Sequence, residues 1–111
     1  MTVKELTEKA GFKVVNLAEG AEHIEIKKIF CCDLLSIAMA KMPEGAAWVT
    51  VMSNLNTLAV AALSEAACVV IAEDTPIDDS VINKSGAQNI TILATDMPVY
   101  EAARKIEEIA L

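Results

Sequence analysis

The chain has 111 residues, of which 54% are hydrophobic and 23% are charged, and its net charge is −7. This length and balance predict one packed domain rather than a disordered chain. The excess of acidic residues and the shortage of aromatic residues exclude a nucleic-acid-binding module, because such modules depend on Lys, Arg and exposed aromatic rings.

The first third of the chain predicts a helix followed by two strands. Thr2 and Glu5 fit a capping box at the start of the helix, and Gly11 is placed to end the helix in a left-handed conformation. Strands are predicted over Phe12–Leu17 and Ile24–Cys31. We expect these two strands to pair as a β-hairpin.

The rest of the chain alternates helices with strands. Asp33 is expected to cap a helix that carries Leu34 to Met42 and ends at Pro43-Glu44-Gly45. The predicted elements that follow are the strands Ala47–Met52, Cys68–Ala72 and Ile90–Ala94, and the helices Asn56–Ala66, Asp78–Ser85 (ended by Gly86) and Met97–Leu111.

These three strands are nearly continuous in apolar character, which is typical of parallel strands buried on both faces. The fold class predicted is therefore α/β: a small mixed, mainly parallel sheet flanked by helices, with an N-terminal helix and a β-hairpin. We expect a single domain over residues 1–111.

The chain carries no sign of export or membrane insertion. It opens without the pattern of a signal peptide, and the longest mostly apolar stretch, Leu58–Ala72, is interrupted and too short to span a bilayer. Three cysteines do not match a disulfide framework. We expect a cytoplasmic protein that binds neither membrane nor nucleic acid.

The candidate ligand-binding residues are Ser53, Asn54, Asn56 and Thr57, which lie where a parallel strand ends and a helix begins. Helix amides at such a position suit an anion or a ribose. The alternative is that Asn56 or Thr57 simply caps the helix. The next loop, with Glu73 and Asp74, is acidic and would repel phosphate; its carboxylates fit a solvated edge or a cation.

No residues suggest a metal, a cofactor or catalysis. A structural metal needs about four ligands, whereas Cys31 and Cys32 are adjacent, Cys68 lies in a core strand and His23 is the only histidine. We interpret the thiols as core or near-core groups and His23 as a surface residue in a turn. With no glycine-rich phosphate loop and no nucleophile–base set, we expect no enzyme activity.

Four sequence segments together resemble the stand-alone DRTGG-domain proteins, over nearly the full chain. They are Asp33-Leu34-Leu35-Ser36, Trp48-Val49-Thr50-Val51 with Asn54-Leu55-Asn56 and the helix after it, Val69-Val70-Ile71, and Ile92-Leu93-Ala94-Thr95-Asp96. In this alignment Ser53-Asn54 stands where the family has Asp-Arg, and Glu73-Asp74 stands where it has a glycine pair. The lost arginine and the two acids disfavour a phosphate-bearing ligand.

The resemblance implies a compact α/β domain that often dimerises. In phosphate acetyltransferases and CBS-domain pyrophosphatases the domain helps to form a dimer and an adenine-nucleotide regulatory site, and a related domain precedes the catalytic part of HPr kinase/phosphorylase. Stand-alone members are often encoded beside iron-only hydrogenase and related redox genes. The sequence has neither the kinase phosphate loop nor the iron–sulfur ligand spacing with which such proteins are sometimes labelled.

The function expected from these observations is a non-catalytic regulatory or interaction module, a homodimer that docks to a redox or metabolic enzyme. The alternative is a sensor domain that binds a nucleotide or metabolite through residues 53–57.

Overall fold

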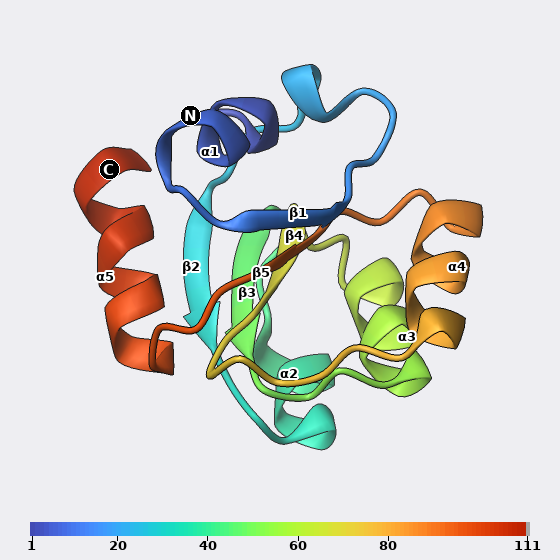
Figure 1. Cartoon of the computed structure of the whole chain (residues 1–111). Helices are drawn as coiled ribbons and strands as arrows, with labels where there is room; N and C mark the ends of the chain where they lie inside the picture. Colours follow the sequence, from blue (N-terminus) through green and yellow to red (C-terminus); the bar gives the residue numbers. More distant parts are fainter. Residues whose placement is uncertain (111) are drawn as a thin grey trace.

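The computed structural model describes residues 1–110 and contains a five-stranded sheet with helices on both faces (Figure 1). Its elements are α1 (Val3–Lys9), β1 (Lys13–Asn16), the 3-10 turn η1 (Ala21–His23), β2 (Lys28–Cys31), α2 (Leu35–Lys41), β3 (Ala46–Thr50), α3 (Leu55–Leu63), β4 (Cys68–Ile71), α4 (Asp79–Ala87), β5 (Ile92–Ala94) and α5 (Val99–Ala110). Leu111, at the end of the predicted last helix, lies outside the described residues.

The strand order is β1-β5-β4-β3-β2, with β2 to β5 parallel and β1 antiparallel to β5. The α/β fold class with a mixed, mainly parallel sheet is therefore confirmed. Every residue of β3 and β4 is buried, as the continuous apolar runs predict. The antiparallel pair involves β1, but its partner comes from the other end of the chain.

The predicted hairpin between Phe12–Leu17 and Ile24–Cys31 is wrong. β1 and β2 lie at opposite edges of the sheet, and the 3-10 turn η1 precedes a strand that is only four residues long. Alternating apolar and polar residues predict that a segment is a strand, but they do not identify its partner.

Hydrogen bonds to residues directly before β5 explain why β1 pairs with β5 and not with β2. The backbone N–H of Ala18 donates to Thr91 Oγ1 (2.9 Å), and that of Glu19 donates to Asn89 Oδ1 (2.7 Å). The chain after β1 is thus held at the amino end of β5, and residues 20–27 carry it to the far edge of the sheet.

Two apolar cores lie on the two faces of the sheet. The crossovers from β2 to β5 place α2, α3 and α4 on one face, and α1 and α5 cover the other (Figure 1). Because successive strand residues point to opposite faces, Trp48 joins the core under α2, α3 and α4, while Val49 joins the core under α1 and α5. No helix within residues 1–110 is long and apolar enough to cross a membrane.

The predicted start and end of α1 are confirmed. Glu5 N–H donates to Thr2 Oγ1 (3.1 Å), and Thr2 N–H donates to Glu5 Oε1 (3.0 Å), which completes the capping box. That backbone hydrogen bond is the main reason why the pKa of Glu5 lies below its ordinary value. Gly11 has a φ of +76°.

Gly86 does not end α4, contrary to prediction. The helix continues to Ala87, and Asn89 takes the left-handed conformation with a φ of 57°. Asparagine tolerates this region, and here its amide also holds the backbone of Glu19: Asn89 Oδ1 accepts from Glu19 N–H (2.7 Å) and Asn89 Nδ2 donates to Glu19 O (3.2 Å).

The end of α3 offers a site for stabilisation. Ala66 N–H donates to Ala61 O and Glu65 N–H to Ala62 O, the Schellman pattern, with Glu65 in the left-handed position at a φ of 54°. We expect Glu65→Gly to raise the free energy of unfolding by roughly 0.5–1 kcal/mol, because glycine carries no Cβ penalty there. Urea unfolding of Glu65→Gly beside Glu65→Ala, which keeps the penalty, checks this; equal stability of the two variants contradicts it.

Candidate functional site

The candidate site is the edge of the sheet where the four parallel strands end. At this edge β4 leads to α4 on one face of the sheet, whereas the adjacent β5 leads to α5 on the other face (Figure 1). Such divergence between neighbouring strands is where open α/β sheets commonly bind ligands.

Three of the four predicted binding residues form hydrogen bonds with the protein itself. Ser53 Oγ donates to Pro76 O (2.7 Å), and Thr57 Oγ1 donates to Met52 O (2.9 Å). Asn54 Oδ1 accepts from Thr57 N–H (3.1 Å). Thr57 is buried, whereas Asn54 and Asn56 are exposed. The four residues therefore lie together, with Ser53 half-buried and the two asparagines exposed.

Asn54, rather than Asn56 or Thr57, is the residue that caps α3. We expect Asn54→Ala to lower the free energy of unfolding by about 1 kcal/mol, because Thr57 N–H would lose its side-chain partner. Asn56 lies two residues later, in the first turn of α3, and is exposed. Asn56→Ala should therefore change the free energy of unfolding by less than about 0.5 kcal/mol. Chemical denaturation of the two variants checks the difference; equal losses would contradict the assigned cap. Whether this loop binds a ligand stays a prediction.

Asp33, also at this edge, does not have the helix-capping role that the sequence predicted. Leu34, not Asp33, occupies the N-cap position of α2, and no side chain caps that helix. Instead Asp33 Oδ1 accepts hydrogen bonds from Thr50 Oγ1 (2.8 Å) and Val51 N–H (2.9 Å). The carboxylate thus joins the end of β2 to the end of β3, through partners that no local pattern reveals.

Glu73 and Asp74 form a tight turn in which both residues have positive φ, 62° and 54°. Thr75 N–H donates to Ala72 O (3.2 Å) across the turn. Two consecutive left-handed residues are a conformation that glycine adopts without strain. This conformation fits the alignment that places Glu73-Asp74 where DRTGG domains have two glycines.

The same turn, which follows β4, is hydrogen-bonded to the loop that follows β5. Glu73 N–H donates to Met97 O (2.9 Å), and Asp74 N–H donates to Thr95 O (3.0 Å). Glu73 Oε2 also accepts from Val99 N–H (3.4 Å) at the start of α5. These bonds satisfy amides that an anion would otherwise bind, and the carboxylates add negative charge. The edge therefore disfavours a polyphosphate ligand.

The cysteines and the histidine do not come together. Cys68 is fully buried, which raises the pKa of its thiol to about 12, and Cys32 Sγ donates to Leu34 O (3.3 Å). Cys31 is exposed, which corrects its expected near-core position; residual desolvation, and then the carboxylate of Asp33, raise its pKa. His23 is exposed, as predicted. Within residues 1–110 no three His, Cys, Asp or Glu residues are placed to hold a metal ion.

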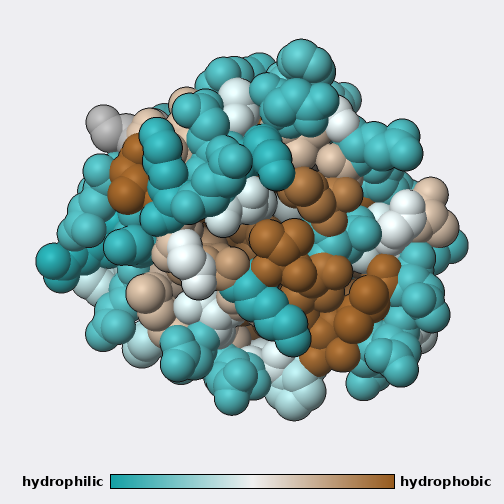
Figure 2. All heavy atoms as spheres, turned by 45° about the horizontal axis from the view of Figure 1, so that its top comes forward, coloured by the Kyte–Doolittle hydropathy of each residue, from teal (hydrophilic) through white to brown (hydrophobic). Residues whose placement is uncertain are grey.

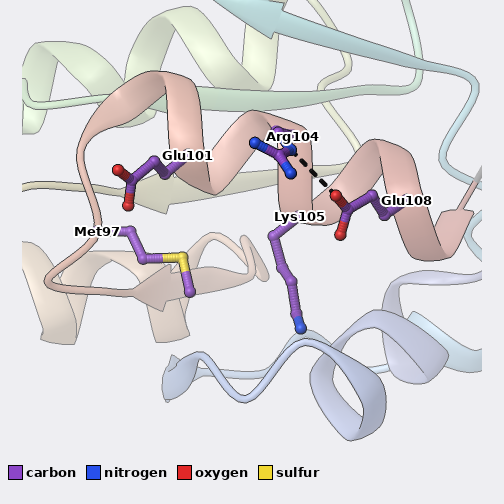
Figure 3. Close-up of a pocket in the computed structure, with 5 residues that line it drawn as sticks. All are labelled: Met97, Glu101, Arg104, Lys105 and Glu108. Atoms are coloured by element: carbon purple, nitrogen blue, oxygen red, sulfur yellow. Dashed lines mark hydrogen bonds and ion pairs between the residues drawn. The ribbon is translucent and has the colours of Figure 1, made fainter.

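Four surface depressions are lined by residues other than those of the predicted loop. One of about 230 Å³ lies along α5, and Figure 3 shows its lining: Met97, Glu101, Arg104, Lys105 and Glu108. Arg104 Nε and Glu108 Oε1 are 3.0 Å apart and point toward each other, whereas Lys105 extends toward α1 (Figure 3). Nearly all of these side chains come from one exposed helix surface, so they form no enclosed site.

Two further depressions adjoin at the opposite, amino edge of the sheet. They measure about 440 and 250 Å³ and share Ile24, Glu65, Ala66 and Ala67 in their walls. A fourth, of about 240 Å³, lies between β1 and α4 and includes Val15, Ile77 and Ile82. None of the four is lined by Ser53, Asn54, Asn56 or Thr57.

No protein-family model and no curated protein sequence matches the chain. A solved structure does: the CBS and DRTGG domains of the regulatory region of Clostridium perfringens pyrophosphatase, in complex with the activator diadenosine tetraphosphate. The similarity has a TM-score of 0.76 at 13% sequence identity, and it covers 95% of this chain and 45% of that chain. The chain therefore has a DRTGG-like fold.

Proposed function

We propose that the chain is a non-catalytic regulatory or interaction module that acts as a homodimer and docks to a redox or metabolic enzyme. The observation that carries the proposal is the fold, which is similar over 95% of this chain to part of a pyrophosphatase regulatory region. The expected partner class follows from the resemblance to stand-alone DRTGG-domain proteins.

The surface supports an interaction role. Within residues 1–110, eight large apolar side chains are at least 37% exposed: Val14, Leu17, Leu34, Ile37, Met39, Leu55, Leu63 and Tyr100. Single exposed apolar residues are ordinary, but neighbouring ones form patches that a partner can cover. Leu34 and Ile37, one turn apart at α2, are such a pair for a partner enzyme.

Dimerisation predicts a melting temperature that depends on protein concentration. Association that stabilises the folded state shifts the unfolding equilibrium by mass action. For two chains of this length, the melting temperature should rise by about 3 °C per tenfold increase in concentration. Scanning calorimetry over a hundredfold concentration range checks this. A constant melting temperature would contradict a dimer that is coupled to folding.

A second candidate is a sensor that binds a nucleotide or metabolite through residues 53–57. The similar pyrophosphatase region was solved with a nucleotide activator. In this chain Asn54 and Asn56 are exposed at the loop between β3 and α3. The acidic turn at Glu73-Asp74 favours a ligand with few or no phosphates.

Thermal shift with adenosine, AMP and diadenosine tetraphosphate tests this candidate. A sensor should be stabilised by adenosine or AMP more than by the tetraphosphate, and Asn56→Ala should abolish the shift while leaving basal stability unchanged. The matched control is Asn83→Ala, an exposed asparagine on α4. A shift that survives Asn56→Ala would contradict this loop as the site.

A further inference from the structure

Helices α2 and α3 have an outer surface that is almost free of charge. The seven residues of α2 and the nine of α3 include a single charged residue, Lys41. The two helices are neighbours on the same face of the sheet (Figure 1). Five of the eight exposed large apolar side chains of residues 1–110 belong to these helices or to the N-cap of α2, and we call them the α2–α3 surface: Leu34, Ile37, Met39, Leu55 and Leu63.

The α2–α3 surface has the pattern of a helix layer that another helix covers. The exposed apolar residues of α3 recur at helical spacing along one stripe: Leu55, Ala59, Ala62 and Leu63. A helix that faces solvent normally carries charged residues there, as α5 does with Glu101, Arg104 and Glu108. An apolar stripe of this spacing fits the apolar face of a further helix.

Charges in the neighbouring loops indicate the chemistry of that helix. The four loops that follow the parallel strands are residues 32–34, 51–54, 72–78 and 95–98. They contain no Lys, Arg or His and five acidic residues, all exposed: Asp33, Glu73, Asp74, Asp78 and Asp96. The edge of the sheet at which α2 and α3 begin is therefore strongly negative.

Three of these carboxylates lie beside the α2–α3 surface. Asp33 directly precedes Leu34 in the chain. Asp74 and Asp78 each lie two residues from Pro76, whose carbonyl O accepts a hydrogen bond from Ser53 Oγ (2.7 Å) just before the start of α3. A partner with Lys or Arg beside its apolar residues gains from this charge. A second copy docked through the same surface would set carboxylates against carboxylates, which disfavours it as the occupant.

We propose that the α2–α3 surface docks an amphipathic helix of the partner enzyme, whose apolar face is bordered by Lys or Arg. This inference rests on the proposed function and specifies the chemistry of the partner. The docked helix covers Ile37 and Leu55, and its basic residues lie against the exposed carboxylates of the loops that precede α2 and α4.

The first test maps the docking surface by nuclear magnetic resonance. The probe is a helical peptide of about 18 residues, about 27 Å long, with Leu on one face and Lys along both borders of that face. Its binding should shift the amide signals of α2 and α3. Figure 2 shows another hydrophobic surface, in brown, on the part of the molecule where β1 and α4 lie. Shifts confined to β1 and α4 would overturn the proposal.

A charge variant tests the carboxylates. Asp74→Asn with Asp78→Asn should raise the dissociation constant of the Lys peptide at least about tenfold at low salt. Asparagine tolerates the left-handed φ of Asp74 (54°) and suits the N-cap position of Asp78, so the fold should persist.

The matched control removes two carboxylates from the other face of the sheet. Glu8→Gln with Glu107→Gln, at exposed positions on α1 and α5, should leave the dissociation constant within about twofold of the wild-type value. Equal losses in the two double variants would ascribe the binding to net charge alone and overturn the proposal.

An apolar variant tests the α2–α3 surface itself. Ile37→Gln with Leu55→Gln should also raise the dissociation constant at least about tenfold, because both side chains lie under the docked helix. Tyr100→Gln, on α5 at a site that is 73% exposed, is the control and should leave it unchanged. Circular dichroism verifies that each variant is folded. An unchanged dissociation constant in the folded Ile37→Gln, Leu55→Gln variant would contradict the assigned surface.

A peptide with Glu in place of Lys separates this inference from the proposed function. Tighter binding of the Glu peptide overturns a basic partner and leaves a docking role standing. Failure of both peptides to bind overturns the α2–α3 surface as a helix-docking site, and the homodimer is tested independently by its mass in solution.

Discussion

Trp48→Phe is expected to lower the free energy of unfolding by about 2–3 kcal/mol. Trp48 is fully buried in the core under α2, α3 and α4, and its Nε1 donates to Cys32 O (3.0 Å). Phenylalanine leaves a cavity and also leaves that carbonyl without the indole donor, and both effects destabilise. Trp48 therefore ties the chain after β2 to the core.

Urea unfolding followed by circular dichroism measures this loss, since the substitution removes the only tryptophan. Tyr100→Phe is the control, because Tyr100 is 73% exposed and its change should stay within about 0.5 kcal/mol. A loss below about 1 kcal/mol for Trp48→Phe would contradict the packing described.

Asp33→Ala is expected to cost about 2 kcal/mol. The carboxylate accepts hydrogen bonds from the hydroxyl of Thr50, which is fully buried, and from the backbone of Val51. Bonds to a charged acceptor contribute more than neutral ones, and a buried donor without a partner carries a desolvation cost. Asp33→Asn keeps an acceptor oxygen and should lose less than half as much.

Chemical denaturation of the two Asp33 variants distinguishes two roles for this carboxylate: a hydrogen-bonded connection to the end of β3, or a cap of α2. If Asp33 served only as a cap of α2, the asparagine variant would match the wild type and the alanine variant would lose about 1 kcal/mol. Recovery of the loss when Thr50→Val is added to Asp33→Ala would confirm the hydroxyl as the partner, because the unpaired donor is then removed.

The parallel part of the sheet could be predicted from the sequence because its signal is local. Continuous apolar runs such as Cys68–Ile71 reflect burial on both faces, and the structure buries every residue of that strand. The capping box of α1 was likewise predictable from residues three positions apart.

Long-range pairing explains the misassigned elements. β1 reaches β5 across most of the chain, and its position depends on hydrogen bonds from Ala18 and Glu19 to the side chains of Thr91 and Asn89. Asp33 reaches Thr50, so its role as a helix cap was predicted from the wrong neighbours. In each case the decisive partner lies far away in the sequence.

The candidate site was predicted from the position of residues 53–57 in the sequence. That position indicates where the loop lies in the fold, but not which contacts its side chains make. The loop follows β3 at the carboxyl edge of the parallel strands, which is the position that the alternation of strands and helices predicts. That position says nothing of whether the loop binds a ligand. It does not reveal that Ser53 Oγ donates to Pro76 O or that Thr57 is buried. Those contacts reduce the exposed polar side chains of the loop to Asn54 and Asn56.

The mass of the chain in solution tests the central claim, a regulatory module that acts as a homodimer. Light scattering at micromolar concentration, across a salt series, should give twice the 11.8 kDa of one chain. A mass of 11.8 kDa throughout that range would contradict the homodimer.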